Sequence, residues 1–116
     1  MVSVRELADA GCTVVEPDTR LTLENSAELL NTIQAMSAPV SPSLVINLSQ
    51  TRVIDSSGVG ALVNSLKHIQ KKNGSLVLTG LRPEILHMFQ LMNLHQVFDI
   101  VETEALAVKQ LTTGRV

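Results

Sequence analysis

The stretch RVIDSSGVGALVNSL, residues 52–66, joins two segments of different periodicity. Before it, the run LVINL at residues 44–48 is apolar and rich in branched side chains, as in a buried strand. After it, apolar residues recur at helical spacing and define one helix face: Val59, Leu62, Val63, Leu66 and Ile69. The pattern therefore predicts a strand, a short loop and a helix, in this order.

The loop of this unit ends in Asp55-Ser56-Ser57-Gly58, at the expected start of the helix. Asp and Ser are favoured there because their side-chain oxygens accept hydrogen bonds from the unpaired N–H groups of the first turn. Gly58 and Gly60 lower helix propensity, which is expected where something approaches the backbone closely. The stretch thus presents hydroxyl groups at the positive end of a helix.

An ordinary N-cap between a strand and a helix also explains this loop. No G-x-S-x-G surrounds either serine, so a hydrolase nucleophile elbow is not indicated. The G-x-x-x-x-G-K-[ST] pattern of a phosphate-binding loop is also absent from the sequence. On these residues alone, capping remains the simplest explanation.

The sequence VINLSQTRVIDSSGVGALV, within residues 44–66, resembles the signature of STAS domains, in particular bacterial anti-sigma factor antagonists. In that family the first serine after the aspartate is phosphorylated by a partner kinase that is also the anti-sigma factor. Matched residue by residue, the resemblance makes Asp55 the aspartate and Ser56 the phosphoacceptor, with Ser57 as the alternative. It implies a partner-binding surface made of Asp55, Ser56, Ser57, Gly58, Val59 and Gly60.

The composition predicts one domain covering residues 1–116. Hydrophobic residues make up 45% and charged residues 17%, as in an ordinary globular protein. Only 2% of the residues are aromatic, so the core must be aliphatic and stacking platforms for nucleic acid are lacking. The net charge of −2 and the scattered basic residues also argue against nucleic-acid binding.

Cysteine and histidine give no sign of a metal site or a disulfide framework. Cys12 is the only cysteine, and His68, His87 and His95 lack the spacing of zinc ligands. Neither a signal peptide nor a membrane span is recognisable, so we expect a cytoplasmic protein that does not bind membranes.

The rest of the chain divides into alternating strands and helices. Strands are expected at residues 2–7, 12–16, 43–48, 76–78 and 97–101. One helix is expected to begin at residue 25 and to be ended by prolines 39 and 42. Further helices are expected at residues 57–72, 83–92 and 102–111. Residues 17–23 are expected to form a loop, and residues 112–116 a frayed tail.

Local signals support several of these boundaries. Asn25 followed by Glu28 matches a capping box. The first two strands are expected to form a hairpin through the turn at residues 9–11, with Gly11 at positive φ. Asn73-Gly74 matches a helix C-cap, Gly80 a turn, and residues 83–84, Pro-Glu, the first turn of a helix. In that helix we expect the apolar residues to be buried together: Ile85, Met88, Phe89 and Met92.

From residue 44 onward the order is β-α-β-α-β-α, which predicts a mainly parallel sheet with right-handed crossovers. The hairpin in front should add an antiparallel edge. The predicted fold class is therefore α/β, with the STAS fold: a mixed, mostly parallel sheet of four to five strands flanked by about four helices.

The resemblance covers residues 14–108, and residues 82–107 are similar to the family's third helix, fifth strand and final helix. In family members the third helix and the DSSG loop form the partner surface. The chain departs from the family earlier, where many members carry a Gly and then Leu-Asp before the first helix. Thr19, Leu21 and Thr22 occupy these places here, so a threonine replaces the aspartate.

The resemblance implies a phosphoswitch rather than an enzyme, without a cofactor. The unphosphorylated protein would bind an anti-sigma factor serine kinase of the GHKL type and release a sigma factor, and a PP2C-like phosphatase would reset it. The alternative is a non-switching STAS interaction module in a transport- or signalling-associated complex. A small enzyme or nucleotide-binding protein is disfavoured because no constellation of base and nucleophile is visible. The oligomeric state is left open between a monomer and a weak dimer.

Overall fold

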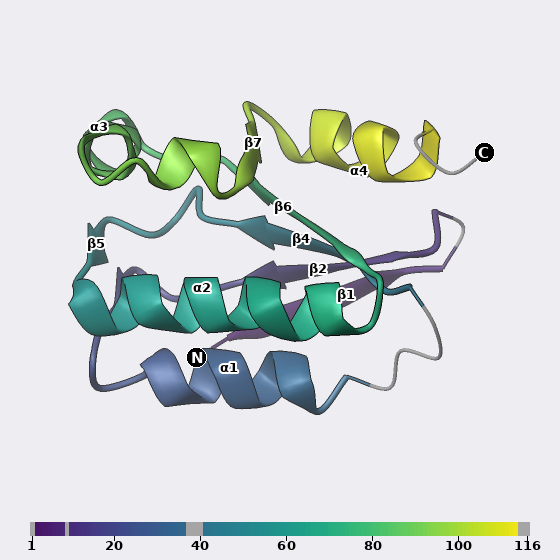
Figure 1. Ribbon diagram of the computed structural model, residues 1–116, viewed down its shortest axis with the longest axis horizontal. Helices are drawn as coiled ribbons and strands as arrows, with labels where there is room; N and C mark the ends of the chain where they lie inside the picture. The colour runs from purple at the N-terminus through teal and green to yellow at the C-terminus, as the bar shows by residue number, and fades with distance from the viewer. Residues whose placement is uncertain (1, 9, 37–40, 114–116) are drawn as a thin grey trace.

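The computed structural model describes residues 2–8, 10–36 and 41–113. Its centre is a five-stranded sheet in the order β1-β2-β4-β6-β7 (Figure 1). These strands are β1 (Ser3–Leu7), β2 (Cys12–Glu16), β4 (Ser43–Asn47), β6 (Ser75–Thr79) and β7 (Asp99–Val101). β1 pairs antiparallel with β2, and the other neighbours pair in parallel. The predicted mixed sheet with an antiparallel edge is thus confirmed.

Helices α1 and α2 cover one face of this sheet and α4 covers the other (Figure 1). The helices are α1 (Ser26–Gln34), α2 (Ser56–Lys71), α3 (Pro83–Leu91) and α4 (Glu104–Thr113). A short 3₁₀ helix, η1 (Leu94–Gln96), follows α3 where the sequence predicted only a connection. The result is the α/β fold with helices on both faces that the strand and helix order predicts.

The sheet separates two groups of buried apolar residues, because successive side chains of a strand point to opposite faces. Along β4, Leu44 and Ile46 belong to the larger core under α1 and α2. Val45, between them, belongs with Val77 to the smaller core under α4. The apolar face of the helix at residues 57–72 is predicted to pack against Val45, Ile46 and Val77. The packing of α2 against Ile46 is confirmed, but Val45 and Val77 lie on the opposite face of the sheet.

Most turn residues behave as predicted. Gly11 and Gly80 have φ of 67° and 73°, a region that side chains rarely enter. At the end of α2, however, the left-handed residue is Asn73, with φ of 57°, and not Gly74. Gly74 is needed for a different reason, because a Cβ there would lie 2.3 Å from the carbonyl oxygen of Pro42. The predicted turn residue 9 and the segment 37–40 lie outside the described residues.

The C-terminal third differs from the prediction at two exposed apolar residues. Met92 follows the end of α3 and is 49% exposed, so it does not join the buried Ile85 and Phe89. Val97 is 51% exposed and precedes β7, which begins only at Asp99. Phe98 is buried instead and its ring centroid lies 6.1 Å from that of Phe89. Val97 and Phe98, which the pattern assigned to the last strand, instead connect η1 to β7.

The start of α4 is tied to the sheet by a polar cluster. Arg5 on β1 makes ion pairs with Glu104 and with Glu16 at the end of β2. Glu104 also accepts a hydrogen bond of 3.0 Å from the side-chain amide of Asn47. These contacts join the antiparallel edge, a central strand and the last helix.

Candidate functional site

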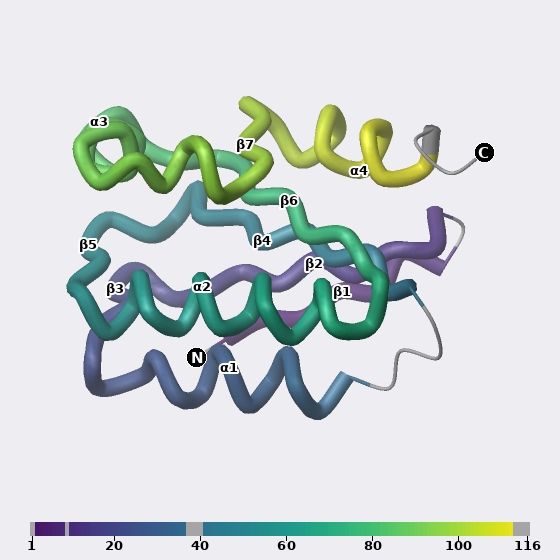
Figure 2. Tube along the Cα trace, viewed as in Figure 1, coloured from purple at the N-terminus to yellow at the C-terminus, as the bar shows by residue number. Residues whose placement is uncertain are grey.

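The DSSG loop follows a second, two-stranded sheet that the sequence did not predict. β3 (Arg20–Leu21) pairs in parallel with β5 (Val53–Ile54), at the end of the molecule where α2 begins (Figure 2). The N–H of Asp55 continues this contact by donating to the carbonyl oxygen of Leu21. Residues 17–23 were expected to be a loop, because two-residue strands are too short to show an alternating pattern. This ribbon brings the loop before α1 next to Asp55.

Asp55 is the N-cap of α2, which begins at Ser56, one residue before the predicted start. Its Oδ1 accepts a hydrogen bond of 2.9 Å from the N–H of Gly58. Its Oδ2 accepts a second one, of 3.1 Å, from the N–H of Leu23 in the loop before α1. The N–H of Gly58, and then that of Leu23, hold the pKa of Asp55 below its ordinary value. One carboxylate therefore holds both segments of the site.

The hydrogen bonds of Asp55 favour its ionised form in the folded state, which makes the stability dependent on pH. Because the pKa of Asp55 is lower in the folded state than in the unfolded state, its contribution to stability is complete above the ordinary pKa of Asp, about 3.9. It is lost as the pH falls through the depressed value. We therefore expect the free energy of unfolding to fall with decreasing pH below about pH 5, measured by urea denaturation.

Asp55→Asn keeps a capping oxygen and removes the charge, so its stability should vary less over this acid range. Glu104 provides a matched comparison, since Arg5 chiefly lowers its pKa as well. Glu104→Gln and Asp55→Asn together should flatten the curve more than either alone. Identical curves for wild type and the double variant would contradict the assignment.

The two serines differ in accessibility. Ser56 is the first residue of α2 and is exposed, whereas Ser57 is half-buried. Both stand in the first turn, where backbone N–H groups lack partners within the helix. The hydroxyl of Ser56 is thus the more accessible to an enzyme that approaches from solvent.

Gly58 and Gly60 have different surroundings, although the sequence treats them alike. A Cβ at Gly58 would lie 2.2 Å from the carbonyl oxygen of Leu21 and 2.9 Å from Cγ2 of Ile54. At Gly60 no atom of the described chain lies within 4 Å of such a Cβ. The close approach expected at both glycines is found only at Gly58. The open space over Gly60 lies one helical turn after Ser56, on the same side of α2.

Alanine substitutions should separate these two glycines. Gly58→Ala should lower the free energy of unfolding by about 1–3 kcal/mol, because backbone of the β3–β5 ribbon must move. Gly60→Ala should be neutral or raise it by up to about 1 kcal/mol, through better helix propensity. Chemical denaturation of both variants tests this, and equal losses at the two positions would contradict it.

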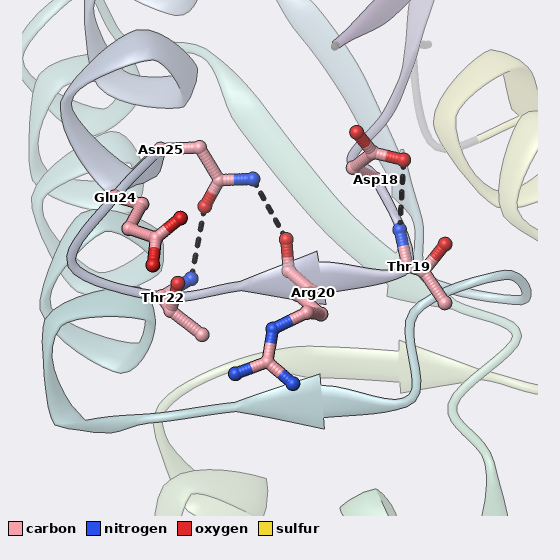
Figure 3. Close-up of a pocket in the computed structure, with 6 residues that line it drawn as sticks. All are labelled: Asp18, Thr19, Arg20, Thr22, Glu24 and Asn25. Carbon is pink, nitrogen blue, oxygen red and sulfur yellow. Dashed lines mark hydrogen bonds between the residues drawn. The ribbon is translucent and has the colours of Figure 1, made fainter.

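The loop from β3 to α1 is held by Asn25 rather than by a carboxylate at position 22 (Figure 3). Asn25 Oδ1 accepts from the N–H of Thr22 at 2.9 Å, and its Nδ2 donates to the carbonyl oxygen of Arg20 at 2.7 Å. Its side chain makes no capping bond to α1, so the predicted capping box with Glu28 is wrong. Thr22, at the place of the aspartate in the family resemblance, is buried, and the hydrogen bonds of Asn25 hold the loop without a carboxylate there.

A polar cavity of about 370 Å³ opens beside this loop. The six residues drawn in Figure 3 line it: Asp18, Thr19, Arg20, Thr22, Glu24 and Asn25. Leu23 is 76% exposed next to Asp55, and Val53 on β5 is 39% exposed. Sequence reasoning missed both as members of the site, because a single apolar residue in a loop carries no periodic signal.

Neither a metal site nor a membrane-spanning helix is found among the described residues. Residues 2–8, 10–36 and 41–113 contain no group of three or more His, Cys, Asp or Glu placed to hold a metal ion. Among the same residues, none of the helices has the length and apolar character needed to cross a membrane.

Comparison with known families identifies this arrangement of ribbon, DSSG loop and helix. The model of the STAS domain matches residues 4–107, nearly the whole chain. The chain belongs to the STAS domain family. The fold and the resemblance seen in the sequence are thereby confirmed.

Relatives and solved structures agree with this STAS assignment. The chain is 30% identical over 61 residues to the anti-sigma-B factor antagonist of Listeria monocytogenes. These 61 residues are 53% of this chain and 54% of that protein. The match thus spans about half the length of the curated relative. A structure of an anti-sigma-factor antagonist (STAS) domain protein from Planctomyces limnophilus is similar with a TM-score of 0.84 and 21% identity, covering 95% and 97% of the two chains.

The same fold also occurs in a transporter. The murine Solute Carrier 26 family member A9 anion transporter contains a region similar to 89% of this chain, with a TM-score of 0.76 and 15% identity. This region is 18% of the transporter chain. The fold therefore serves more than one kind of assembly, and the function must be argued from the site.

Proposed function

We propose that this STAS protein is an anti-sigma factor antagonist that is switched by phosphorylation of Ser56. The unphosphorylated form binds an anti-sigma factor serine kinase of the GHKL type, which then releases a sigma factor. A PP2C-like phosphatase reverses the modification. The observation that carries the proposal is the exposed hydroxyl of Ser56 at the start of α2, beside the doubly bonded carboxylate of Asp55.

The position of Ser56 makes phosphorylation compatible with the fold. A phosphate there would carry a charge of about −1.5 to −2 at the N-terminus of α2. Free N–H groups and the helix dipole favour an anion at this end. Asp55 keeps its bond to Gly58 within the same turn. The modification should therefore change the binding of a partner and leave the domain folded.

The surface around Ser56 fits a protein partner. It combines the serine with the open backbone of Gly60 on the same side of α2. Exposed apolar residues flank it: Val53 on the ribbon and Leu23 in the loop before α1. A partner that packs against α2 can approach closely over Gly60, where a side chain would prevent it.

A second function rests on the likeness to a transporter: a STAS module that binds a neighbour without being switched. Such a module needs no hydroxyl at position 56. Ser56 and its exposure favour the switch.

The test is phosphorylation by a purified anti-sigma factor serine kinase of the GHKL type, with ATP and Mg²⁺. We expect one phosphate, located on Ser56 by mass spectrometry, both in this reaction and in protein isolated from its own cells. Ser56→Ala should remain unmodified, and Ser57→Ala serves as the matched control that is still modified. If phosphate were found only on Ser57, Ser57 would be the acceptor. If neither serine were modified, the result would favour the module that is not switched.

The proposal also predicts that the isolated protein has no hydrolytic or transferase activity, because the kinase supplies the nucleotide and the chemistry. Incubation with ATP and Mg²⁺ without the kinase should produce neither ADP nor a modified chain. Turnover that disappears in Asp55→Asn or Ser56→Ala would contradict the assignment as an interaction protein.

A further inference from the structure

A second cavity lies away from the DSSG loop, between α3 and the edge strand β7. Its volume is about 470 Å³, within the range of protein sites that bind ligands or side chains. Leu81 follows the end of β6 and Glu102 follows the end of β7, so the cavity opens at the carboxyl ends of two parallel strands. Its lining combines two polar residues, His95 and Glu102, with five apolar ones: Leu81, Pro83, Leu86, Ile100 and Val101.

The strand beside this cavity has one open side. Within residues 2–8, 10–36 and 41–113, β7 is the last strand of the sheet and pairs only with β6, on its inner side. Its outer backbone groups can therefore accept a further strand, as in domains that bind extended peptides by β-augmentation. In such complexes the main chain supplies hydrogen bonds, and pockets beside the edge receive side chains.

Two carboxylates lie at or beside the rim of the cavity, which His95 also lines. Glu102 lines it, and Asp99 projects from the same face of β7 as Val101, two residues earlier. Both carboxylates are exposed, and neither makes an ion pair within the described part of the chain. Lysine and arginine combine an apolar stem with a charged end. Their side chains match an apolar cavity that has carboxylates at its mouth.

We propose that the β7 edge is a second docking site, for an extended segment of a partner protein that carries a lysine or arginine. The segment adds to β7 as a strand and places the aliphatic stem against Leu86 and Ile100. The charged end reaches Glu102. This site is distinct from the α2 surface and goes beyond the proposed switch, because it does not involve Ser56.

An NMR titration of the whole ¹⁵N-labelled chain tests the site. The probe is the extended peptide TVKVT, acetylated and amidated, and the matched control is TVEVT. We expect saturable shifts at residues 81–86 and 95–102 with TVKVT. Its affinity should be about fivefold above that of TVEVT, the effect of one exposed charge pair. Shifts centred on residues 55–60, or equal affinities for the two peptides, would overturn the proposal.

Variants distinguish the contribution of the Glu102 carboxylate to binding from that of the apolar cavity. Glu102→Gln should remove most of the preference for TVKVT, while Glu28→Gln, the same change on α1, should keep it. Leu86→Trp fills the cavity and should abolish the shifts of both peptides, with the fold checked by its unchanged remaining spectrum. Ser56→Asp should bind TVKVT like wild type, so the test succeeds or fails independently of the switch. Saturable binding of n-butylammonium without binding of either peptide would also overturn the assignment to a protein segment.

Discussion

Leu66→Asp should unfold this domain. Leu66 is 8% exposed and lies in the larger core, where α2 packs on Ile46 and Leu78. A carboxylate there has no partner among its apolar neighbours, and an unpaired buried charge costs several kcal/mol in addition to the lost apolar contacts. Together these two costs approach the free energy of unfolding of a typical domain, roughly 5–15 kcal/mol. The expected result is loss of the dispersed NMR spectrum and of cooperative thermal unfolding.

Two companion variants make this result specific. Leu66→Ala should remain folded and lose about 2–5 kcal/mol of unfolding free energy, the usual cost of truncating a buried leucine. Asn64→Asp places the same charge on the exposed side of α2 and should change the stability by less than about 0.5 kcal/mol. If Leu66→Ala left the free energy of unfolding unchanged, α2 would present a different face to the sheet.

Ser56→Asp should bind the kinase about 10 to 1,000 times more weakly than wild type, with its thermal stability unchanged. The helix end accommodates the negative charge within the domain, so the cost arises in the complex. Asp55 already places one carboxylate next to position 56. A docked partner must bury or repel the additional charge, which costs roughly 2–5 kcal/mol when it is uncompensated. Titration calorimetry with the purified kinase measures the change.

The neighbouring serine is the control for Ser56→Asp. Ser57→Asp adds the same charge one residue later, at a half-buried position, and Ser56→Ala removes only the hydroxyl. We expect Ser56→Ala to bind like wild type and to resist phosphorylation. If Ser56→Asp bound the kinase as tightly as wild type and Ser57→Asp did not, Ser57 would be the acceptor. Full binding by both would leave the switch without support.

The order of elements was predictable from the sequence because its signals are local. The branched apolar run of β4, the helical spacing of α2 and the capping by Asp55 all depend on residues a few positions apart. The same holds for the hairpin of β1 and β2, where Gly11 takes positive φ. The position of Ser56 at a helix start followed from the same signals, and its proposed role from the family resemblance.

Contacts between distant segments were decided only by the tertiary structure. Asp55 accepts a hydrogen bond from Leu23, 32 residues earlier, because β3 and β5 pair as strands too short to have a pattern of their own. Asn25, which looked like a helix cap, bonds Thr22 and Arg20 instead, since the fold turns this loop toward the ribbon. The sequence shows that Val45 and Ile46 are apolar and alternate in direction. Which of them meets α2 and which meets α4 depends on the side of the sheet that each helix reaches after its crossover.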